Sequence, residues 1–427
     1  MPTVAVHTDT FARLARATAL ASGMPTARQA FVPQPVVGRS PAQLRGYIEG
    51  TDPVSKRPFM LEVIEGLTRP LDEKDTKGTS FERSAARLLA PDGEENLQQL
   101  FVDQKWTDFL PIVLPTEERV ARMLEGTSRK PDQIVGRLAP TLFREAWEFD
   151  VEKVAVNAVM AGCRPEYLPV VLALAASGQT ARSSSTTSFA VLALVNGPIR
   201  REIGMDSGIG ALGPFNHANA TIGRAYNLLS QNLQGGCVPG ETYMGSLGNW
   251  MNYSACFPEA EERSPWTPFH VDKGFRREES VASVFFGGRY MLAGFGPRAT
   301  WQEELRRALA GCEQHLAPLF VMDPLAARGF AELGFDTRDK LARWLAENGR
   351  LSAREYWDNQ WVQTLLRPLA AAGVEPYAAK WRAKPDELVR LFEPEEISLA
   401  VAGGETQPAW RMFGGRYIKS VRIDDWR

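Results

Sequence analysis

Short apolar runs alternate with amphipathic stretches along most of the chain. Apolar runs flanked by turn residues predict strands, whereas apolar residues repeated every three or four positions predict helices. Strands are predicted over residues 3–7, 30–35, 189–195, 281–286 and 319–322, and a further apolar run covers 397–402. Helices are predicted over 11–22, 41–48, 117–124, 218–233, 301–312 and 324–333, and in two runs that end at Gly162 and Ala176. This alternation predicts an α/β fold.

Composition divides the chain into three regions. Residues 1–70 contain two strand candidates, too few for an independent sheet. They therefore predict a partial small α/β domain that packs on another domain or another chain. Residues 71–100 are rich in charge with interspersed Pro, Gly and Ser, which is typical of a linker. Residues 101–427 predict a larger α/β domain of the catalytic type.

The overall composition excludes several classes of protein. Of 427 residues, 44% are hydrophobic and 23% charged, with a net charge of −2, so no nucleic-acid or membrane-surface partner is expected. No apolar run reaches the roughly 18 residues that cross a bilayer, and no secretory signal is visible. The four cysteines form no Cys-x-x-Cys pair, which indicates reduced thiols and a cytoplasmic location. With four histidines and no His-Glu-x-x-His, we expect no standard zinc site.

Cys163 has the most distinctive setting of the candidate residues. A glycine ends the helical run before it, and Pro165 suits the first turn of the next helix, although Pro169 leaves the start of that helix open. The thiol would then lie at a helix N-terminus beside Arg164, where the helix dipole favours a thiolate. The alternative is a small buried residue at a helix–helix corner. We expect Cys163 to be the most reactive cysteine, with Cys237 as its main competitor.

A glycine-rich segment follows at residues 207–213, where Gly208, Gly210 and Gly213 form the pattern Gly-x-Gly-x-x-Gly. No strand precedes it, and Pro214 interrupts the passage into a helix, so a dinucleotide site is not favoured. We predict instead a loop that approaches a small anion closely and leads to a helix N-terminus that binds it. The residues expected to support this site are Asn216, Asn219 and Thr221, together with Asn157 and Asn196. The alternative is a tight turn in which an asparagine caps the helix.

Residues 245–270 combine glycine, asparagine, aromatic and acidic residues in one long segment. Long loops of this kind are often functional lids. Its candidate acid/base groups are His270 and Glu261. Its candidate binding residues are Asn249, Asn252 and Trp266. The alternative is a solvated connection with two tryptophans packed on the surface.

These segments resemble the family named for a selenocysteine- or cysteine-Gly-Ser-Cys motif, the UGSC family. The resemblance runs from about Trp106 to the last residue, through the matching segments 108–116, 157–167, 195–198, 207–224 and 264–270. Residues 2–68 resemble the second half of the family's small N-terminal domain. The resemblance implies a large domain after a small one, and it adds Glu166 and Tyr167 to the candidate substrate-binding residues. The family's chemistry is poorly defined, so the resemblance does not specify a reaction.

The chain departs from the family in two ways. The first half of the small domain, with the Cys-Gly-Ser-Cys motif, is missing. His and Lys of the family's loop pattern are replaced by Asn249 and Asn252, and an Arg by His217, so the substrate or the activity is expected to differ. We expect a second subunit to supply the missing half, because half of a sheet leaves an open strand edge. Homo-oligomerisation through that edge and genuine loss of the half-domain are the alternatives.

Three hypotheses for the function follow. The first is an enzyme that acts on a small anionic or carbonyl-containing molecule through thiol chemistry at Cys163, as one subunit of a hetero-oligomer. The second is a cofactor-free lyase or hydratase in which carboxylate and histidine groups such as Glu261 and His270 transfer protons. The third is a non-catalytic subunit that scaffolds a partner carrying the redox motif. The sequence identifies no cofactor.

Overall fold

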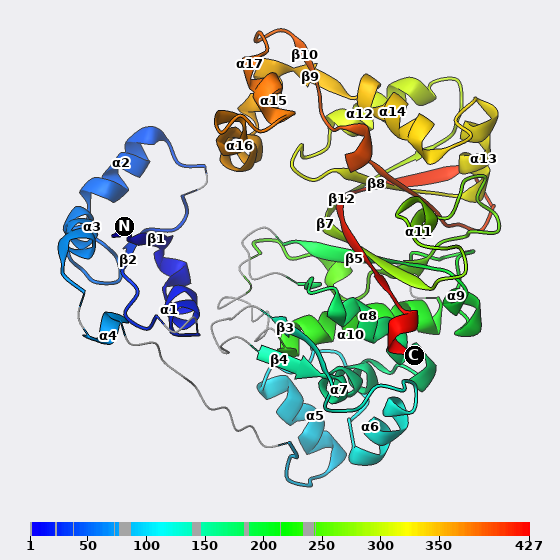
Figure 1. The fold of residues 1–427 in the computed structure, drawn as a ribbon, viewed down its shortest axis with the longest axis horizontal. Helices are drawn as coiled ribbons and strands as arrows, with labels where there is room; N and C mark the ends of the chain where they lie inside the picture. The colour runs from blue at the N-terminus through cyan, green and yellow to red at the C-terminus, as the bar shows by residue number, and fades with distance from the viewer. Residues whose placement is uncertain are drawn as a thin grey trace.

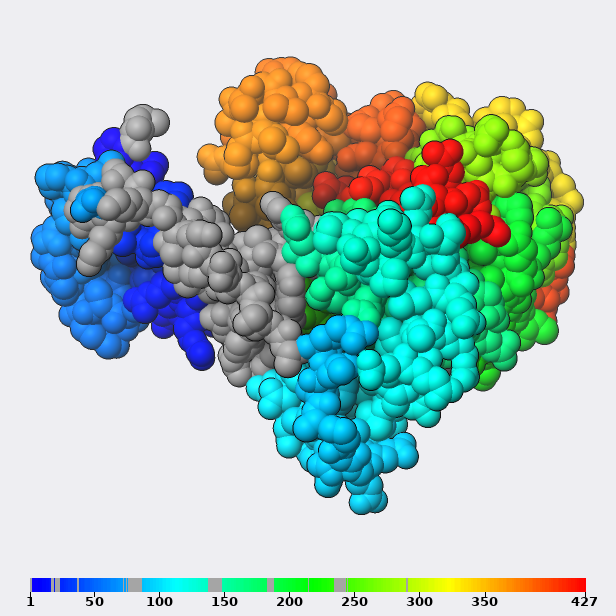
Figure 2. Space-filling view, turned by 60° about the horizontal axis from the view of Figure 1, so that its bottom comes forward, coloured from blue at the N-terminus to red at the C-terminus, as the bar shows by residue number. Residues whose placement is uncertain are grey.

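The computed structural model describes residues 2–21, 24–36, 38–71, 73–76, 87–138, 147–182, 188–213, 215–233, 243 and 245–427. Near the N-terminus of the chain, strands β1 (Ala5–Thr8) and β2 (Gln29–Val32) pair in parallel, with helix α1 (Ala12–Ala21) between them in the sequence. Helices α2 (Pro41–Glu49), α3 (Phe59–Thr68) and α4 (Glu73–Thr76) follow. These elements form a lobe of their own, blue in both views (Figure 1, Figure 2), which we call the N-terminal unit.

The small sheet of the N-terminal unit has a helix on each face. α1 packs Ala15 against Phe31 on one face, and α3 packs Phe59 against Val32 on the other. The buried carboxylate of Asp52 accepts a hydrogen bond from the Phe31 N–H at 2.7 Å. Asp52 thus satisfies this backbone donor on the edge of β2 that faces away from β1. Among the described strands, β1 pairs only with β2, so its outer edge has no strand partner.

A mixed six-stranded sheet forms the centre of the remaining chain. Its strands are β5 (Ala190–Asn196), β6 (Cys256–Pro258), β7 (Val281–Phe295), β8 (Pro318–Met322), β11 (Ser398–Val401) and β12 (Ala409–Arg422). Their order in the sheet is β11-β8-β12-β7-β5-β6. β5 runs parallel to β6, and β8 runs parallel to β11. The long antiparallel strands β7 and β12 join these two parallel pairs.

This sheet curls until its two edges meet. Gly287 on β7 has a φ of 141°, and a Cβ there would lie 2.2 Å from the carbonyl oxygen of Gly414 on β12, so only glycine fits this crossing. Just after β6, the N–H of Ala260 donates a hydrogen bond to the carbonyl of Val401 on β11 at 2.7 Å. The curled sheet encloses side chains from both halves, including Leu192, Phe257, Phe285, Leu319 and Phe413.

Helices cover the outer face of the sheet in two groups (Figure 1). The first group, α7 (Val151–Ala161), α8 (Leu168–Ala176) and α10 (His217–Leu233), packs on β5 and β7. The second group, α12 (Trp301–Ala310), α13 (Pro324–Glu332) and α14 (Arg338–Asn348), packs on β8, β11 and β12. Every side chain of β5 is buried, as expected for a strand that is covered on both faces.

The other elements surround these layers. They are α5 (Glu94–Asp103), α6 (Glu117–Leu124), β3 (Ile134–Leu138), β4 (Trp147–Asp150), α9 (Ile199–Glu202), α11 (Phe269–Asp272), β9 (Arg350–Ser352), α15 (Ala353–Asp358), α16 (Arg367–Ala371), α17 (Tyr377–Arg382) and β10 (Leu388–Arg390). α5 includes residues 94–100 of the predicted linker and packs Phe101 into the core beneath α7 and α10. No helix in the described parts of the chain combines the length and apolar character needed to cross a membrane.

The predicted α/β fold is confirmed, and local signals located several boundaries correctly. α6 covers the predicted residues, with the Thr116 hydroxyl accepting a hydrogen bond from the Arg119 N–H at 3.3 Å. Pro165 begins a 3-10 turn and Pro169 is the second residue of α8, so both prolines lie in first turns. The prediction ends β7 nine residues too early and omits β12. Glycines at 287–288 and 414–415 interrupt the apolar pattern of both strands.

Candidate active site

The carboxyl ends of the two parallel strand pairs meet on one side of the curled sheet. The Ala260–Val401 hydrogen bond joins the ends of β6 and β11. The Gly403 N–H after β11 donates to the carbonyl of Ser207 at 2.9 Å and so holds the glycine loop against the same side. Ligands of α/β proteins bind outside the carboxyl ends of strands, so we place the candidate site here.

Glu259 forms the centre of a buried polar cluster at this position and is fully buried. One carboxylate oxygen accepts hydrogen bonds from Asn196 Nδ2 at 2.6 Å and from the Phe269 N–H at 2.7 Å. The other accepts from the guanidinium of Arg338, which also donates to Asp272 at 2.9 Å. The cluster therefore ties β5, β6, α11 and α14 together around one buried carboxylate.

Glu261 and His270, the two predicted acid/base groups, lie next to this cluster and close to each other. His270 Nδ1 is 3.9 Å from Glu261 Oε1, and the imidazole is fully buried. Among the described residues, neither ring nitrogen has a hydrogen-bond partner. Unpartnered buried nitrogens are rare in folded proteins, which marks this pair as a candidate for proton transfer.

The turn after β5 holds the Glu261 carboxylate. Glu261 Oε1 accepts hydrogen bonds from Asn196 Nδ2 at 2.9 Å and from the Gly197 N–H at 2.7 Å. Gly197 has a φ of 86°, and a Cβ there would lie 2.2 Å from the Glu279 carbonyl oxygen, so the turn requires glycine. Arg200 on α9 places Nη2 2.9 Å from Glu261 Oε2. The predicted residues Asn196, Glu261 and His270 thus form one site.

Glu262 marks the exposed side of this site, because about half of its side chain is accessible to solvent. Partial burial alone would raise the pKa of Glu262, but the hydrogen bond and the positive charge of Arg200 outweigh it and lower that pKa. The Arg338 guanidinium, which pairs with Glu259, lies 5.8 Å from the centre of the Trp266 ring. Trp266 donates its indole N–H to the Phe335 carbonyl at 2.8 Å. It supports Arg338 from within the core.

Cys163 lies at the C-terminal end of α7, where its N–H donates to the Ala158 carbonyl at 2.9 Å. The 3-10 turn that begins at Pro165 runs directly into α8, so Cys163 precedes a helix start, as expected. Desolvation by the surrounding protein raises the pKa of the Cys163 thiol to about 12, against the smaller opposing effects of Thr221 and Arg224. The expectation of a lowered pKa is therefore wrong, and the thiol lies at the corner between α7 and the turn into α8 with intermediate exposure.

We expect slow alkylation of Cys163 at neutral pH. A thiol with a pKa of about 12 is about one part in 10⁴ thiolate at pH 8, so iodoacetamide should react about 10³-fold more slowly than with an unperturbed cysteine. The rate of alkylation should rise about tenfold per pH unit over the pH range in which the protein stays folded. Peptide mapping after timed alkylation measures it. Fast labelling of Cys163 at pH 8 would contradict the assignment. The expected competitor Cys237 lies outside the described residues.

Hydrogen bonds within the protein occupy the residues at the start of α10. The Asn216 side chain accepts from the Asn219 N–H at 3.0 Å and so caps the helix. Asn219 is buried and donates to the carbonyls of Asp206 and Ala211, while the Thr221 hydroxyl donates to the His217 carbonyl. These contacts are those of the capping alternative, and anion binding by this helix end stays a prediction.

The glycine loop consists of consecutive tight turns. The Gly208 N–H donates to the Asp206 carboxylate at 2.6 Å, and the Gly213 N–H donates to the Gly210 carbonyl at 2.7 Å. Of the three glycines, only Gly210 has a positive φ, at 75°. Gly208 and Gly210 line a pocket at the ends of β8 and β11.

The segment 245–270 is not one exposed lid, because it contributes strand β6 to the sheet and the buried Glu259, Trp266 and His270 to the core. Asn249 donates to the carbonyls of Ser188 and Gly288, both at 2.9 Å. Asn252 is buried, and its side-chain oxygen has no hydrogen-bond partner among the described residues. Neither asparagine belongs to the Glu259 cluster.

Three further predicted residues lie along α7 and the turn that follows it. Asn157 is buried and joins α7 to α10, accepting a hydrogen bond from Asn232 at 2.7 Å. Glu166 is exposed, whereas Tyr167 is buried with its hydroxyl 3.4 Å from His217 Nδ1. None of these residues contacts the Glu261–His270 pair in the described structure.

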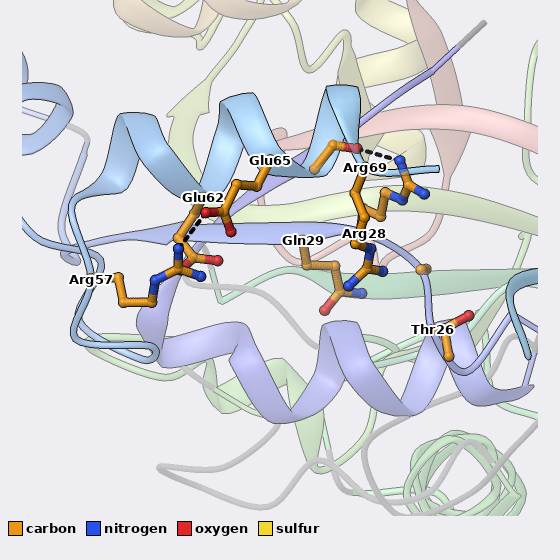
Figure 3. A pocket seen from close by; sticks show the side chains of 9 residues that line it. Thr26, Arg28, Gln29, Arg57, Glu62, Glu65 and Arg69 are labelled. Carbon is orange, nitrogen blue, oxygen red and sulfur yellow. Dashed lines mark hydrogen bonds and ion pairs between the residues drawn. The ribbon is translucent and has the colours of Figure 1, made fainter. Parts of the chain in front are cut away.

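A separate pocket of about 380 Å³ lies in the N-terminal unit, where Arg28, Arg57 and Arg69 approach the acidic face of α3 (Figure 3). Arg57 forms ion pairs with Glu62 at 3.0 Å and with Glu65 at 2.6 Å. Arg28 donates to backbone carbonyls of the same unit. Asp75 lies 3.6 Å from Arg28 and 3.9 Å from Arg69, so all three arginines have acidic partners within the unit and this pocket carries no functional assignment.

Sequence reasoning missed three charged residues of the candidate site: Glu259, Arg338, which pairs with it, and Arg200, which pairs with Glu261. Glu259 directly follows an apolar triplet in a segment that the sequence predicts as a loop, and Arg338 begins a helix that was not predicted.

No group of three or more His, Cys, Asp or Glu side chains in the described ranges is placed to hold a metal ion. Comparisons with protein-family models, curated proteins and solved structures found no match for this chain.

Proposed function

We propose that this chain is an acid–base enzyme, of the lyase or hydratase class, that acts on a small anionic or carbonyl-containing molecule. The observation that carries the proposal is the buried imidazole of His270, which has no hydrogen-bond partner among the described residues and lies 3.9 Å from the Glu261 carboxylate. A carboxylate beside an imidazole can take a proton from a substrate and pass it on.

Each group of the pair has a defined role in the proposal. Glu261 is nearer the surface, beside the half-exposed Glu262, so it contacts the substrate and removes a proton from the carbon next to the carbonyl. His270, which is fully buried, accepts that proton through Nδ1 and passes it back through Glu261 to the hydroxyl group of the substrate, which leaves as water as the C–O bond breaks and the double bond forms. Arg200 holds the second oxygen of Glu261 and fixes the orientation of the carboxylate.

Thiol chemistry at Cys163 is less well supported, because burial raises the pKa of the thiol to about 12 and a nucleophilic thiolate needs a lowered one. The two mechanisms can be separated by exchange of substrate hydrogen in D₂O, followed by ¹H NMR on a panel of small 2-oxo, 2-hydroxy and dicarboxylic acids. We expect the wild-type chain to exchange the proton next to a carbonyl and Cys163→Ala to retain that activity within about twofold. Loss of exchange in Cys163→Ala, with the fold intact, would return the assignment to the thiol.

The second subunit implied by the UGSC resemblance also remains a proposal, together with a cytoplasmic location. Its support is the N-terminal unit, where β1 has no second strand partner among the described strands and Val6 is 52% exposed. On α3, Met60, Ile64 and Leu67 form an exposed apolar stripe. A partner polypeptide would cover these surfaces, and mass measurement of the assembly purified after co-expression with candidate partners tests this.

A further inference from the structure

A pocket of about 250 Å³ opens where the inner face of the curled sheet ends. β12 lines it with Arg411, the end of β8 with Asp323, and the loop after β11 with Gly403 and Gln407. The glycine loop covers it with Gly208 and its neighbours. The pocket therefore lies at the carboxyl ends of one parallel strand pair, where α/β proteins bind ligands.

Arg411 is the only arginine among the described residues that line this pocket, and no described carboxylate is paired with it. Its strand neighbours Trp410 and Met412 belong to the core on the outer face, so the alternation of the strand directs Arg411 to the inner face. There it lies opposite Val321 of the enclosed core. Its one hydrogen bond to the described residues is a long one of 3.4 Å to the Trp410 carbonyl, and no described acidic side chain forms an ion pair with it.

The acidic residue of the pocket, Asp323, forms no ion pair with Arg411 in the described structure. Asp323 Oδ1 accepts the Leu325 N–H at 2.8 Å and caps α13, and Oδ2 accepts the Glu405 N–H at 2.9 Å. Both oxygens are therefore committed to the backbone. This contrasts with Arg338 and Arg200, whose guanidinium groups are paired with buried carboxylates.

Two glycines let the loop after β11 pack closely against its neighbours beside the pocket. A Cβ on Gly403 would lie 2.3 Å from Asp323 Oδ2, and a Cβ on Gly404 would lie 2.2 Å from the Ile209 side chain. Arg263 fixes the rim by donating to the Gly403 carbonyl at 2.7 Å and to the Ser207 carbonyl at 2.9 Å. The walls are thus held in place before any ligand binds.

We infer that this pocket binds the oxyanion end of a small ligand, a carboxylate or a phosphate, through Arg411. The planar guanidinium offers two parallel N–H donors that match either group. Gln407 and Thr406 at the rim supply polar contacts to the rest of the ligand. The site uses neither Glu261 nor His270, so it stands or fails independently of the proposed proton transfer.

Isothermal titration calorimetry with sodium phosphate and with sodium malonate, at constant ionic strength, tests the inference on the full chain. We expect saturable binding of at least one of these probes to the wild type and at least tenfold weaker binding to Arg411→Gln. Arg416→Gln is the matched control, because Arg416 is exposed on the same strand and does not line the pocket. It should bind as the wild type does.

The pattern of probes identifies the chemistry. Binding of phosphate alone supports a phosphate ester as the ligand, binding of malonate alone supports a carboxylate, and binding of both supports an oxyanion site of either kind. If Arg411→Gln unfolds at a lower temperature than the wild type, Arg411→Lys takes its place, with about tenfold weaker binding expected because the planar fork is lost. Failure of both probes to saturate on the folded wild type, or equal binding by the Arg411 variants, overturns the inference.

Discussion

Replacing Arg338 with alanine is expected to destabilise the protein by about 3–5 kcal/mol, because it leaves Glu259 as an unpaired charge in the core. Glu259 is fully buried and Arg338 is 8% exposed, so water cannot replace the lost partner. The Asp272 ion pair and the packing of the guanidinium on Trp266 are lost in the same change. Few single substitutions in this chain should cost as much.

Urea denaturation followed by tryptophan fluorescence measures this effect as a lower midpoint at an unchanged slope. Arg307→Ala is the matched control, because Arg307 pairs with Glu303 on the surface of α12 and both side chains are more than half exposed. That variant should stay within about 1 kcal/mol of the wild type. Similar midpoints for the two variants would mean that the Glu259–Arg338 pair is not the buried charge centre described above.

The second large effect is expected from Glu261→Gln, which should lower the rate of substrate proton exchange about 10²- to 10⁴-fold. The amide has nearly the same shape as the carboxylate and can still accept hydrogen bonds from Asn196 and Gly197, but it cannot accept the substrate proton. His270→Gln should lower the rate in the same direction, because Glu261 then has no neighbouring group to take up the proton.

Glu262→Gln is the control for this prediction, since Glu262 is the adjacent acidic residue and also pairs with Arg200. It should retain exchange within about threefold, and thermal melting of all three variants establishes that they are folded. A Glu261→Gln protein that exchanges as fast as the wild type would remove Glu261 from the mechanism. An equal loss in Glu262→Gln would indicate that the charge balance around Arg200 matters, rather than a specific base.

Local interactions explain what could be predicted from the sequence. Ser40 and Thr116 cap their helices by hydrogen bonds to residues three positions further along, and such contacts can be recognised from a few neighbouring residues. The buried strand β5 is likewise predicted correctly, since its uninterrupted apolar run is typical of a strand covered on both faces. Where glycines interrupt the pattern, as in β7 and β12, local reasoning finds only part of the strand or none of it.

Assembly of the site depended on contacts between residues far apart in the chain. The sequence by itself determined the α/β class and proposed Asn196, Glu261 and His270 as separate candidates. The parallel pairing of β5 with β6 placed Asn196 beside Glu261, and the curl of the sheet, which brings the end of β6 against β11, added Arg338 from a helix that was not predicted. The same packing decided against an activated Cys163, because desolvation depends on how many atoms surround the sulfur, and no local pattern contains that information.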